Sequence, residues 1–101
     1  MSVAERYWMG LIAGLGCLVC RRFVPTGLPA QLHHVAEGSG VRSNYGIAPL
    51  CQEHHTGRSG FHGMGSKAFC QLYRPPGDCE YGLLVWVAQD LAITLKQRKA
   101  A

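Results

Sequence analysis

The chain has 101 residues, of which 48% are apolar and 16% are charged, and it contains 13 glycines. This composition excludes a disordered segment and predicts one small globular domain, residues 1–101, with many turns. The net charge of +4 and the pI near 9.0 favour an anionic partner, either nucleic acid or a membrane surface.

The N-terminal segment predicts a helix over residues 3–15, because apolar side chains recur at three- and four-residue steps. Ser2 and Glu5 have the spacing of a capping box, in which each side chain binds the backbone N–H of the other residue. Gly14 and Gly16 favour the end of the helix. We expect this helix to pack on the core and to take no part in chemistry.

The apolar run over residues 7–20 is shorter than the roughly 20 residues that a membrane-spanning helix needs. No small-residue cleavage site of a signal peptide follows it. These features predict a cytoplasmic chain without membrane association. A membrane-attached lipoprotein stays open as an alternative, because residues 14–17 resemble a lipoprotein cleavage box.

The chain has five cysteines, an odd number that does not suit the disulfide framework of a secreted protein. Cys17 and Cys20 form a C-x-x-C pair, and two thiolates at this spacing on a tight turn can bind one zinc ion in a reducing cytosol. The pair then needs two further ligands from elsewhere, while a redox pair and two buried free thiols remain alternatives. Cys70 and Cys79 are expected to pack in the core, with a second zinc site or a disulfide as the alternative.

Two short strands are predicted next, over residues 30–35 and 45–50, with a glycine-rich loop at 36–43 between them. His33 and His34 are adjacent, so on a strand they face opposite sides. One could bind a metal while the other points elsewhere, or a local bend could direct both into one site. Pro49 limits the second strand to an edge or to a strand end.

The central segment begins at Cys51 and supplies a second pair of ligands. Cys51 and His54 have C-x-x-H spacing, and with Cys17 and Cys20 they predict a tetrahedral site for a structural Zn2+. This ion would join the first helix to the middle of the chain, and its loss would unfold a domain with so small a core. The alternative is that these four residues are separate core or surface groups. A short helix is expected over residues 53–58.

Four histidines remain outside this zinc site, namely His33, His34, His55 and His62. Three imidazoles can hold an open metal site, and the fourth can act as a general base. Because His55 directly follows the zinc ligand His54, the structural site would fix the backbone from which His55 projects.

Two further helices are predicted, over residues 64–73 and 80–97, with prolines and a glycine at 75–77 between them. The first should turn Phe69, Leu72 and Tyr73 inward. The second carries an apolar stripe, and a frayed cationic tail should begin at residue 96. The stripe consists of Leu83, Leu84, Val87, Leu91 and Leu95, with Trp86 and Ile93 beside it.

The order of these motifs resembles that of the HNH (ββα-metal) nucleases, and most of all the phage recombination-enhancement (Ref-like) nuclease group. The pattern covers residues 17–73 and leaves the terminal helices outside it. The resemblance implies a small α+β fold, with a zinc-stapled ββα-metal core flanked by N- and C-terminal helices. The residues that carry it are Cys17, Cys20, His33, His34, Asn44, residues 49–55, residues 60–63, Lys67 and Phe69.

The resemblance also implies roles for the site residues. His33, His55 and His62 would hold a catalytic metal, Mg2+ or another divalent cation. His34 would be the general base that activates water, and Asn44 would orient that base. The implied activity is a metal-dependent DNA endonuclease or nicking enzyme of phage or prophage type, whose partner could be a recombinase filament.

Basic side chains are available to contact DNA phosphates, among them Arg42, Arg58 and Lys67, as well as Arg21 and Arg22. The rival hypothesis is a non-catalytic zinc-binding module that docks on DNA or on a protein partner. In that case the four remaining histidines would hold a second closed zinc site or no metal.

Overall fold

The computed structural model describes residues 1–24, 28–36, 42–77 and 79–100, so residues 37–41 of the predicted glycine-rich loop lie outside the described residues. The predicted α+β class is confirmed, since helices accompany a sheet of two antiparallel strands. The strands are β1 (Gln31–His34) and β2 (Ile47–Leu50). The helices are α1 (Val3–Ala13), α2 (Leu18–Phe23), α3 (Gln52–His55), α4 (Phe61–Met64), α5 (Ser66–Tyr73) and α6 (Cys79–Ala100).

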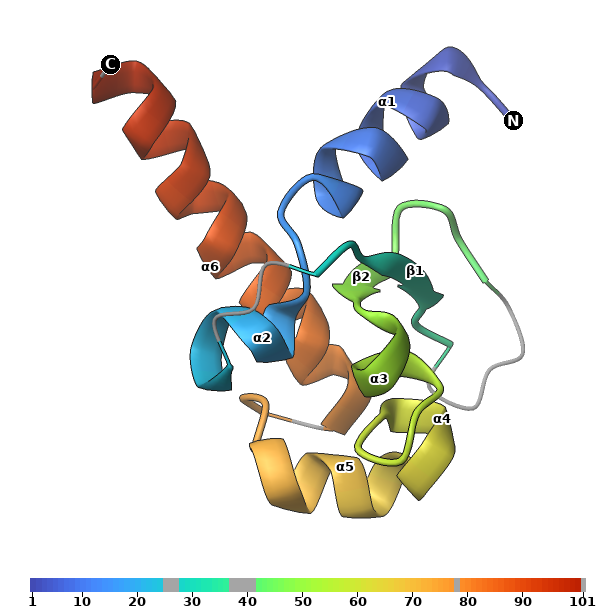
Figure 1. The fold of residues 1–101 in the computed structure, drawn as a ribbon. Coiled ribbons are helices and arrows are strands. Elements are labelled where there is room, and N and C mark those ends of the chain that lie inside the picture. Colours follow the sequence, from blue (N-terminus) through green and yellow to red (C-terminus); the bar gives the residue numbers. More distant parts are fainter. Residues whose placement is uncertain (25–27, 37–41, 78, 101) are drawn as a thin grey trace.

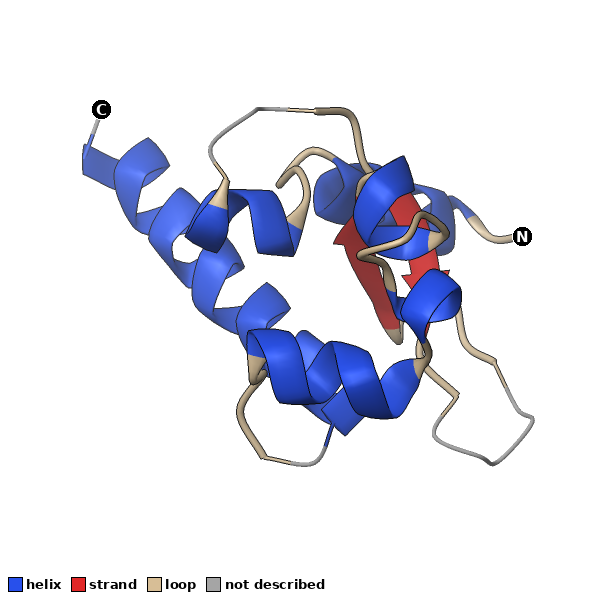
Figure 2. Ribbon diagram, turned by 60° about the horizontal axis from the view of Figure 1, so that its bottom comes forward, coloured by secondary structure: helices blue, strands red, loops and turns tan. Residues whose placement is uncertain are grey.

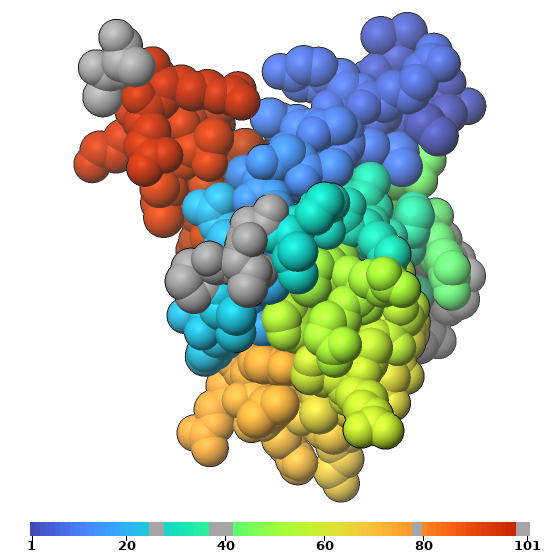
Figure 3. All heavy atoms as spheres, viewed as in Figure 1, coloured from blue at the N-terminus to red at the C-terminus, as the bar shows by residue number. Residues whose placement is uncertain are grey.

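The two strands lie in the middle of the molecule, with helices on both sides of them (Figures 1 and 2). Helix α6 contacts β2, α2 and α5, while α1 contacts both strands. The N-terminal end of α1 and the C-terminal end of α6 project from this body as two separate arms (Figure 3). The core between these elements includes Ile12, Leu18, Ile47, Leu50, Phe69 and Leu83, all fully buried.

The predicted capping box is confirmed at the start of α1. The Ser2 hydroxyl accepts from the Glu5 N–H at 3.0 Å, and the Glu5 carboxylate accepts from the Ser2 N–H at 2.9 Å. The helix ends at Ala13, two residues before the predicted end, because Gly16 takes a positive φ of 79° and turns the chain. Cys17 then caps α2, so the C-x-x-C pair lies at the start of a helix instead of on an isolated turn.

The stretch Val3–Phe23 is long and apolar enough, by length and composition alone, to cross a membrane, and 33% of an apolar 18-residue window within it is buried in the structure. It is nevertheless divided between two helices, because the chain turns between the end of α1 and the start of α2. Helix α1 has 11 residues, which span roughly 16 Å, about half of the hydrocarbon thickness of a bilayer.

The C-terminal helices differ from the prediction in three respects. The helix predicted over residues 64–73 is divided into α4 and α5, because Gly65 adopts a φ of 92°. Leu72, predicted to point inward, is 56% exposed, and Ile93 and Leu95 are about half exposed. The C-terminal part of α6 projects from the body (Figure 1). The tail predicted to fray from residue 96 continues instead as helix to Ala100.

Cys70 lies in α5, packs against the core and is disulfide-bonded, which corrects the prediction of a free core cysteine. The side chain of Cys79, the other cysteine of this region, lies outside the described part. The three remaining cysteines, Cys17, Cys20 and Cys51, are buried thiols. Because disulfides are rare in cytosolic proteins, the bond at Cys70 does not favour the expected reducing compartment.

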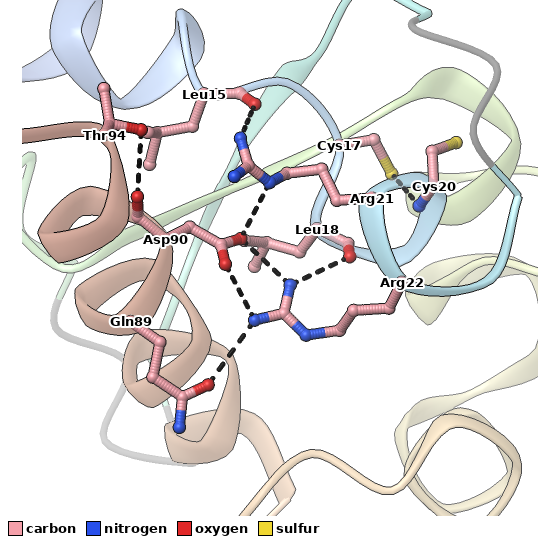
Figure 4. A network of polar contacts seen from close by, with 9 residues as sticks. All are labelled: Leu15, Cys17, Leu18, Cys20, Arg21, Arg22, Gln89, Asp90 and Thr94. Atoms are coloured by element: carbon pink, nitrogen blue, oxygen red, sulfur yellow. Dashed lines mark hydrogen bonds and ion pairs between the residues drawn. The ribbon is translucent and has the colours of Figure 1, made fainter. Parts of the chain in front are cut away.

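A buried carboxylate joins α6 to the C-x-x-C helix α2 (Figure 4). Asp90 is only 4% exposed, and its two oxygens each lie 2.9 Å from one terminal nitrogen of Arg22. Arg21 approaches the same carboxylate at 3.3 Å, and the Arg22 guanidinium lies 4.4 Å from the centre of the Trp86 ring. Arg21 and Arg22 therefore both contribute to the attachment of α2 to α6.

Replacing this carboxylate should loosen the attachment of α2. Because Asp90→Asn leaves two partly buried guanidinium groups without a charged partner, we expect it to lower the free energy of unfolding by about 2 kcal/mol. Urea unfolding of the zinc-loaded protein measures this change. Gln89→Ala is the matched control, since this exposed neighbour reaches Arg22 only at 3.5 Å. Equal effects of the two substitutions would contradict the role given to Asp90.

Candidate metal centre

The four residues of the predicted zinc site come together in the core. Cys17 and Cys20 arrive from the start of α2, and Cys51 and His54 from the start of α3. All four are buried, with exposed fractions between 1% and 8%. Helices α2 and α3 present these side chains because each begins at a cysteine that caps it, which places the fourth residue of each motif one helical turn away.

The spacing of the four ligand atoms fits a tetrahedral zinc ion. The His54 Nδ1 lies 3.5 Å from the sulfurs of Cys17 and Cys20 and 3.2 Å from that of Cys51, and the Cys20 and Cys51 sulfurs are 3.8 Å apart. Standard zinc bond lengths give tetrahedron edges of about 3.8 Å between two sulfurs and about 3.6 Å between a sulfur and a nitrogen. The buried cluster could therefore hold a metal such as zinc.

Burial shifts the pKa of two groups in this cluster. Burial raises the pKa of the Cys17 thiol to about 12, and burial lowers the pKa of His54. The neutral thiol of Cys17 and the neutral imidazole of His54 are thus favoured, and Cys17 would have to lose its proton to bind zinc as a thiolate.

A second cluster of ligand atoms includes His55, the neighbour of His54 on α3. His33 from β1, His55 from α3 and His62 from α4 place one nitrogen each within 4.8 Å of the others. The ring centres of His33 and His55 are 5.4 Å apart, and those of His55 and His62 are 4.9 Å apart. Because His54 and His55 are neighbours on a helix, their side chains diverge by about 100° and enter different clusters.

The glycines after α3 explain how His62 returns to His55. A Cβ atom at Gly63 would overlap the carbonyl group of Gly57, so α4 packs against the backbone of this loop only because position 63 has no side chain. Phe61 is buried beside His33, with ring centres 4.4 Å apart, and it anchors α4 on that side. His62 itself is exposed.

Hydrogen bonds assign the ligand nitrogen of two imidazoles. The Nε2 of His33 lies 2.6 Å from a Glu80 oxygen, while its Nδ1 is buried and has no hydrogen-bond partner among the described residues. The Nδ1 of His55 lies 2.8 Å from the Gln31 side-chain oxygen, which leaves its Nε2 for the cluster. A ligand histidine that donates its second N–H to a carboxylate or carbonyl oxygen is typical of metal sites.

Two imidazoles of this cluster, those of His33 and His55, favour the neutral form. Burial lowers the pKa of His33, although the hydrogen bond with Glu80 acts in the opposite direction. Burial also lowers the pKa of His55, and the neighbouring His33 and His62 add to this effect. Neutral imidazole is the form that binds a metal.

His34 lies outside both clusters and has its own partner. Its Nε2 is 3.0 Å from the Asn44 side-chain oxygen, so the two residues expected to be base and orienting group are in contact. Arg42, Arg58 and Lys67, the predicted phosphate contacts, are exposed and belong to neither cluster.

Sequence reasoning missed two residues that support the second cluster. Glu80 is buried at the start of α6, where it accepts from His33 and, at 3.1 Å, from the Ala36 N–H. Gln31 precedes the histidine pair on β1 and orients His55. A carboxyl group in the first turn of a predicted helix gives no signal of a histidine 47 positions earlier, so Glu80 could not be identified without the fold.

Comparison of the chain with protein-family models, with curated proteins and with solved structures finds no match. The geometry of the two clusters is therefore the basis of the functional argument.

Removing one ligand of the closed cluster should abolish the stable fold. Zinc binding to sites of this type is worth about 10–16 kcal/mol, which is as large as the whole stability of a small domain. We expect Cys51→Ser to lose the bound zinc and its cooperative thermal transition. Metal analysis and circular dichroism measure both, with Gln52→Ala as a control in the same turn. A zinc-free wild-type protein that stays folded would refute this expectation.

Glu80 should strengthen the second cluster without affecting the first. Since loss of such a supporting carboxylate weakens metal binding about 10- to 100-fold, we expect Glu80→Gln to reduce the affinity for a second Co2+ or Zn2+ ion at least about tenfold. Titration of protein whose closed site is already filled measures this affinity. The matched control is Glu53→Gln, because Glu53 is exposed and binds Ser59 rather than a histidine. An unchanged second affinity would show that Glu80 has no such role.

Proposed function

We propose that the chain is a metal-dependent DNA endonuclease or nicking enzyme of the HNH (ββα-metal) type. In this proposal β1, β2 and α3 are the ββα-metal core, and the cluster of Cys17, Cys20, Cys51 and His54 is its structural zinc site. The likeness to the phage recombination-enhancement (Ref-like) nucleases in motif order supports this assignment, and it implies a phage or prophage protein acting in the cytoplasm.

The observation that carries the proposal is the open cluster of His33, His55 and His62. His34, the residue after His33 on β1, contacts Asn44 as the resemblance implies. A closed structural site needs four ligands, whereas three ligands with an exposed edge leave room for water and a phosphate oxygen. The buried Nδ1 of His33, which no described residue satisfies, points to a cation there, because an unsatisfied buried nitrogen is costly.

The donor set bears on which metal fits this cluster. All three donors are imidazoles, which suit zinc, nickel or iron, whereas magnesium prefers carboxylate and water oxygens. We therefore propose a transition metal at this site, and the expected Mg2+ finds no support in the donor set.

In this proposal, different residues of the chain have different roles in phosphodiester hydrolysis. When bound, a divalent cation would supply positive charge next to the scissile phosphate and the leaving oxygen. His34 would accept a proton from the attacking water, and Asn44 would hold the ring through its 3.0 Å contact. Arg42, Arg58 and Lys67 are exposed and would bind phosphates without reading sequence.

A non-catalytic zinc module that docks on DNA or protein is the second candidate. The observation that favours it is the completeness of the closed cluster, whose four ligands are all buried and which needs no second site to stabilise the fold. The two candidates differ in whether His34 has any effect on DNA.

A plasmid-nicking assay separates the candidates. We expect the wild type to nick DNA with Zn2+, Ni2+, Co2+ or Mn2+, and His34→Ala to be about 10²- to 10⁴-fold slower with both clusters still able to bind metal. Gln52→Ala, an exposed position on α3, should cut at the wild-type rate.

The assay should be repeated on DNA carrying a recombinase filament, the partner that the resemblance implies. If the wild type cuts no form of DNA with any of these metals, with Mg2+ or with the filament, the nuclease proposal fails. The zinc-module candidate then stands.

A further inference from the structure

Helix α1 lies outside the motif that resembles a nuclease, yet it contacts the segment just before β2 at two consecutive residues. The Asn44 amide nitrogen donates to the Glu5 carboxylate at 2.8 Å. The Trp8 indole N–H donates to the Tyr45 carbonyl oxygen at 3.1 Å, and the two rings lie 6.4 Å apart. The N-terminal helix therefore fixes the residue that touches His34.

The chemistry of these groups fixes the direction of each hydrogen bond. Hydrogen bonds from the Ser2 backbone, the Asn44 amide and the Ser2 hydroxyl lower the pKa of Glu5 to about 2, so this carboxylate is ionised at neutral pH and can only accept. Asn44 must then turn its NH2 group toward Glu5 and its oxygen toward His34. An amide oxygen accepts only, so the Nε2 of His34 must carry the proton.

This order of donors and acceptors matters for a general base. With the proton on Nε2, the lone pair of His34 is on Nδ1, the nitrogen that Asn44 does not occupy. Asn44 alone could turn its amide by half a rotation and present N–H groups to His34, which would favour the opposite tautomer. Glu5 is the group that prevents this exchange, since a carboxylate cannot bind the amide oxygen.

We propose that Glu5 is a positioning residue that acts through Asn44 to hold His34 in the Nε2–H tautomer, with Nδ1 as the proton acceptor. The catalytic meaning of this arrangement rests on the proposed nuclease function, whereas the tautomer itself does not. This relay is the chain of hydrogen bonds from Glu5 on α1 through Asn44, just before β2, to His34 on β1. It joins three parts of the chain that are distant in sequence.

The test replaces the hydrogen-bond acceptor at position 5 by a donor. A lysine ammonium group only donates, so in Glu5→Lys the amide of Asn44 should turn its oxygen to the new side chain and its N–H groups to His34. We expect the His34 tautomer to change from Nε2–H to Nδ1–H, as measured by long-range ¹H–¹⁵N correlation spectra of the full-length, zinc-loaded protein. Nicking should fall at least about tenfold, because a catalytic histidine in the wrong tautomer loses its function.

Matched variants separate this effect from loss of the helix cap or a change in charge. Glu5→Gln keeps an acceptor oxygen and should retain the Nε2–H tautomer and at least about a third of the wild-type rate. Ser2→Ala weakens the same helix cap without removing the Glu5–Asn44 contact, and Ala4→Lys adds a positive charge at an exposed neighbouring position. Both should keep the wild-type tautomer.

Each outcome supports or overturns the proposal. An Nδ1–H tautomer in the wild type, or an unchanged Nε2–H tautomer in Glu5→Lys, overturns it. If Glu5→Lys does not fold, Glu5→Ala should give a mixture of both tautomers, and a pure Nε2–H form there also overturns it. A tautomer change in Glu5→Lys, when the wild-type chain never cuts DNA, would support the relay and refute only the nuclease function.

Discussion

The convergence of Cys17, Cys20, Cys51 and His54 on one buried point, where they could hold a metal such as zinc, is the constraint on which the rest of the structure depends. A sheet of two four-residue strands and a one-turn helix have little stability of their own. The buried cluster ties the start of α2 to the start of α3 and so joins the N-terminal helices to the strand pair. The two hydrogen bonds between Asp90 and Arg22 then attach α2 to α6.

Whether an interaction could be predicted from the sequence depends on how far apart its two residues are along the chain. The two halves of the closed cluster have fixed local spacings, and so does the Ser2–Glu5 capping box, so all of these could be recognised without a structure. The two strands and the existence of most helices follow from local periodicity in the same way. Their ends do not, because the sequence does not show which glycine takes a positive φ and divides a helix, as Gly65 does.

The residues that escaped prediction act over long separations. Glu80 meets His33 across 47 positions, Glu5 meets Asn44 across 39, and Asp90 meets Arg22 across 68. All three are acids, and an acid on a helix is ordinarily a solvated surface group. Likewise, an apolar stripe indicates only that a helix is able to pack. Leu83 and Val87 of α6 are buried and Leu95 is not, because the body of the protein ends before the helix does (Figure 3).

The three histidines of the open cluster differ in burial, because each lies on a different element. His33 is buried and held by α6 through Glu80, His55 is half-buried and projects from a helix whose start is fixed by the closed cluster, and His62 is exposed on α4. The two inner ligands are thus positioned by contacts that do not depend on the ion they would bind. Only the outer ligand faces solvent. Under the proposed function, a phosphate would therefore approach from the side of His62, where the cluster is open to solvent.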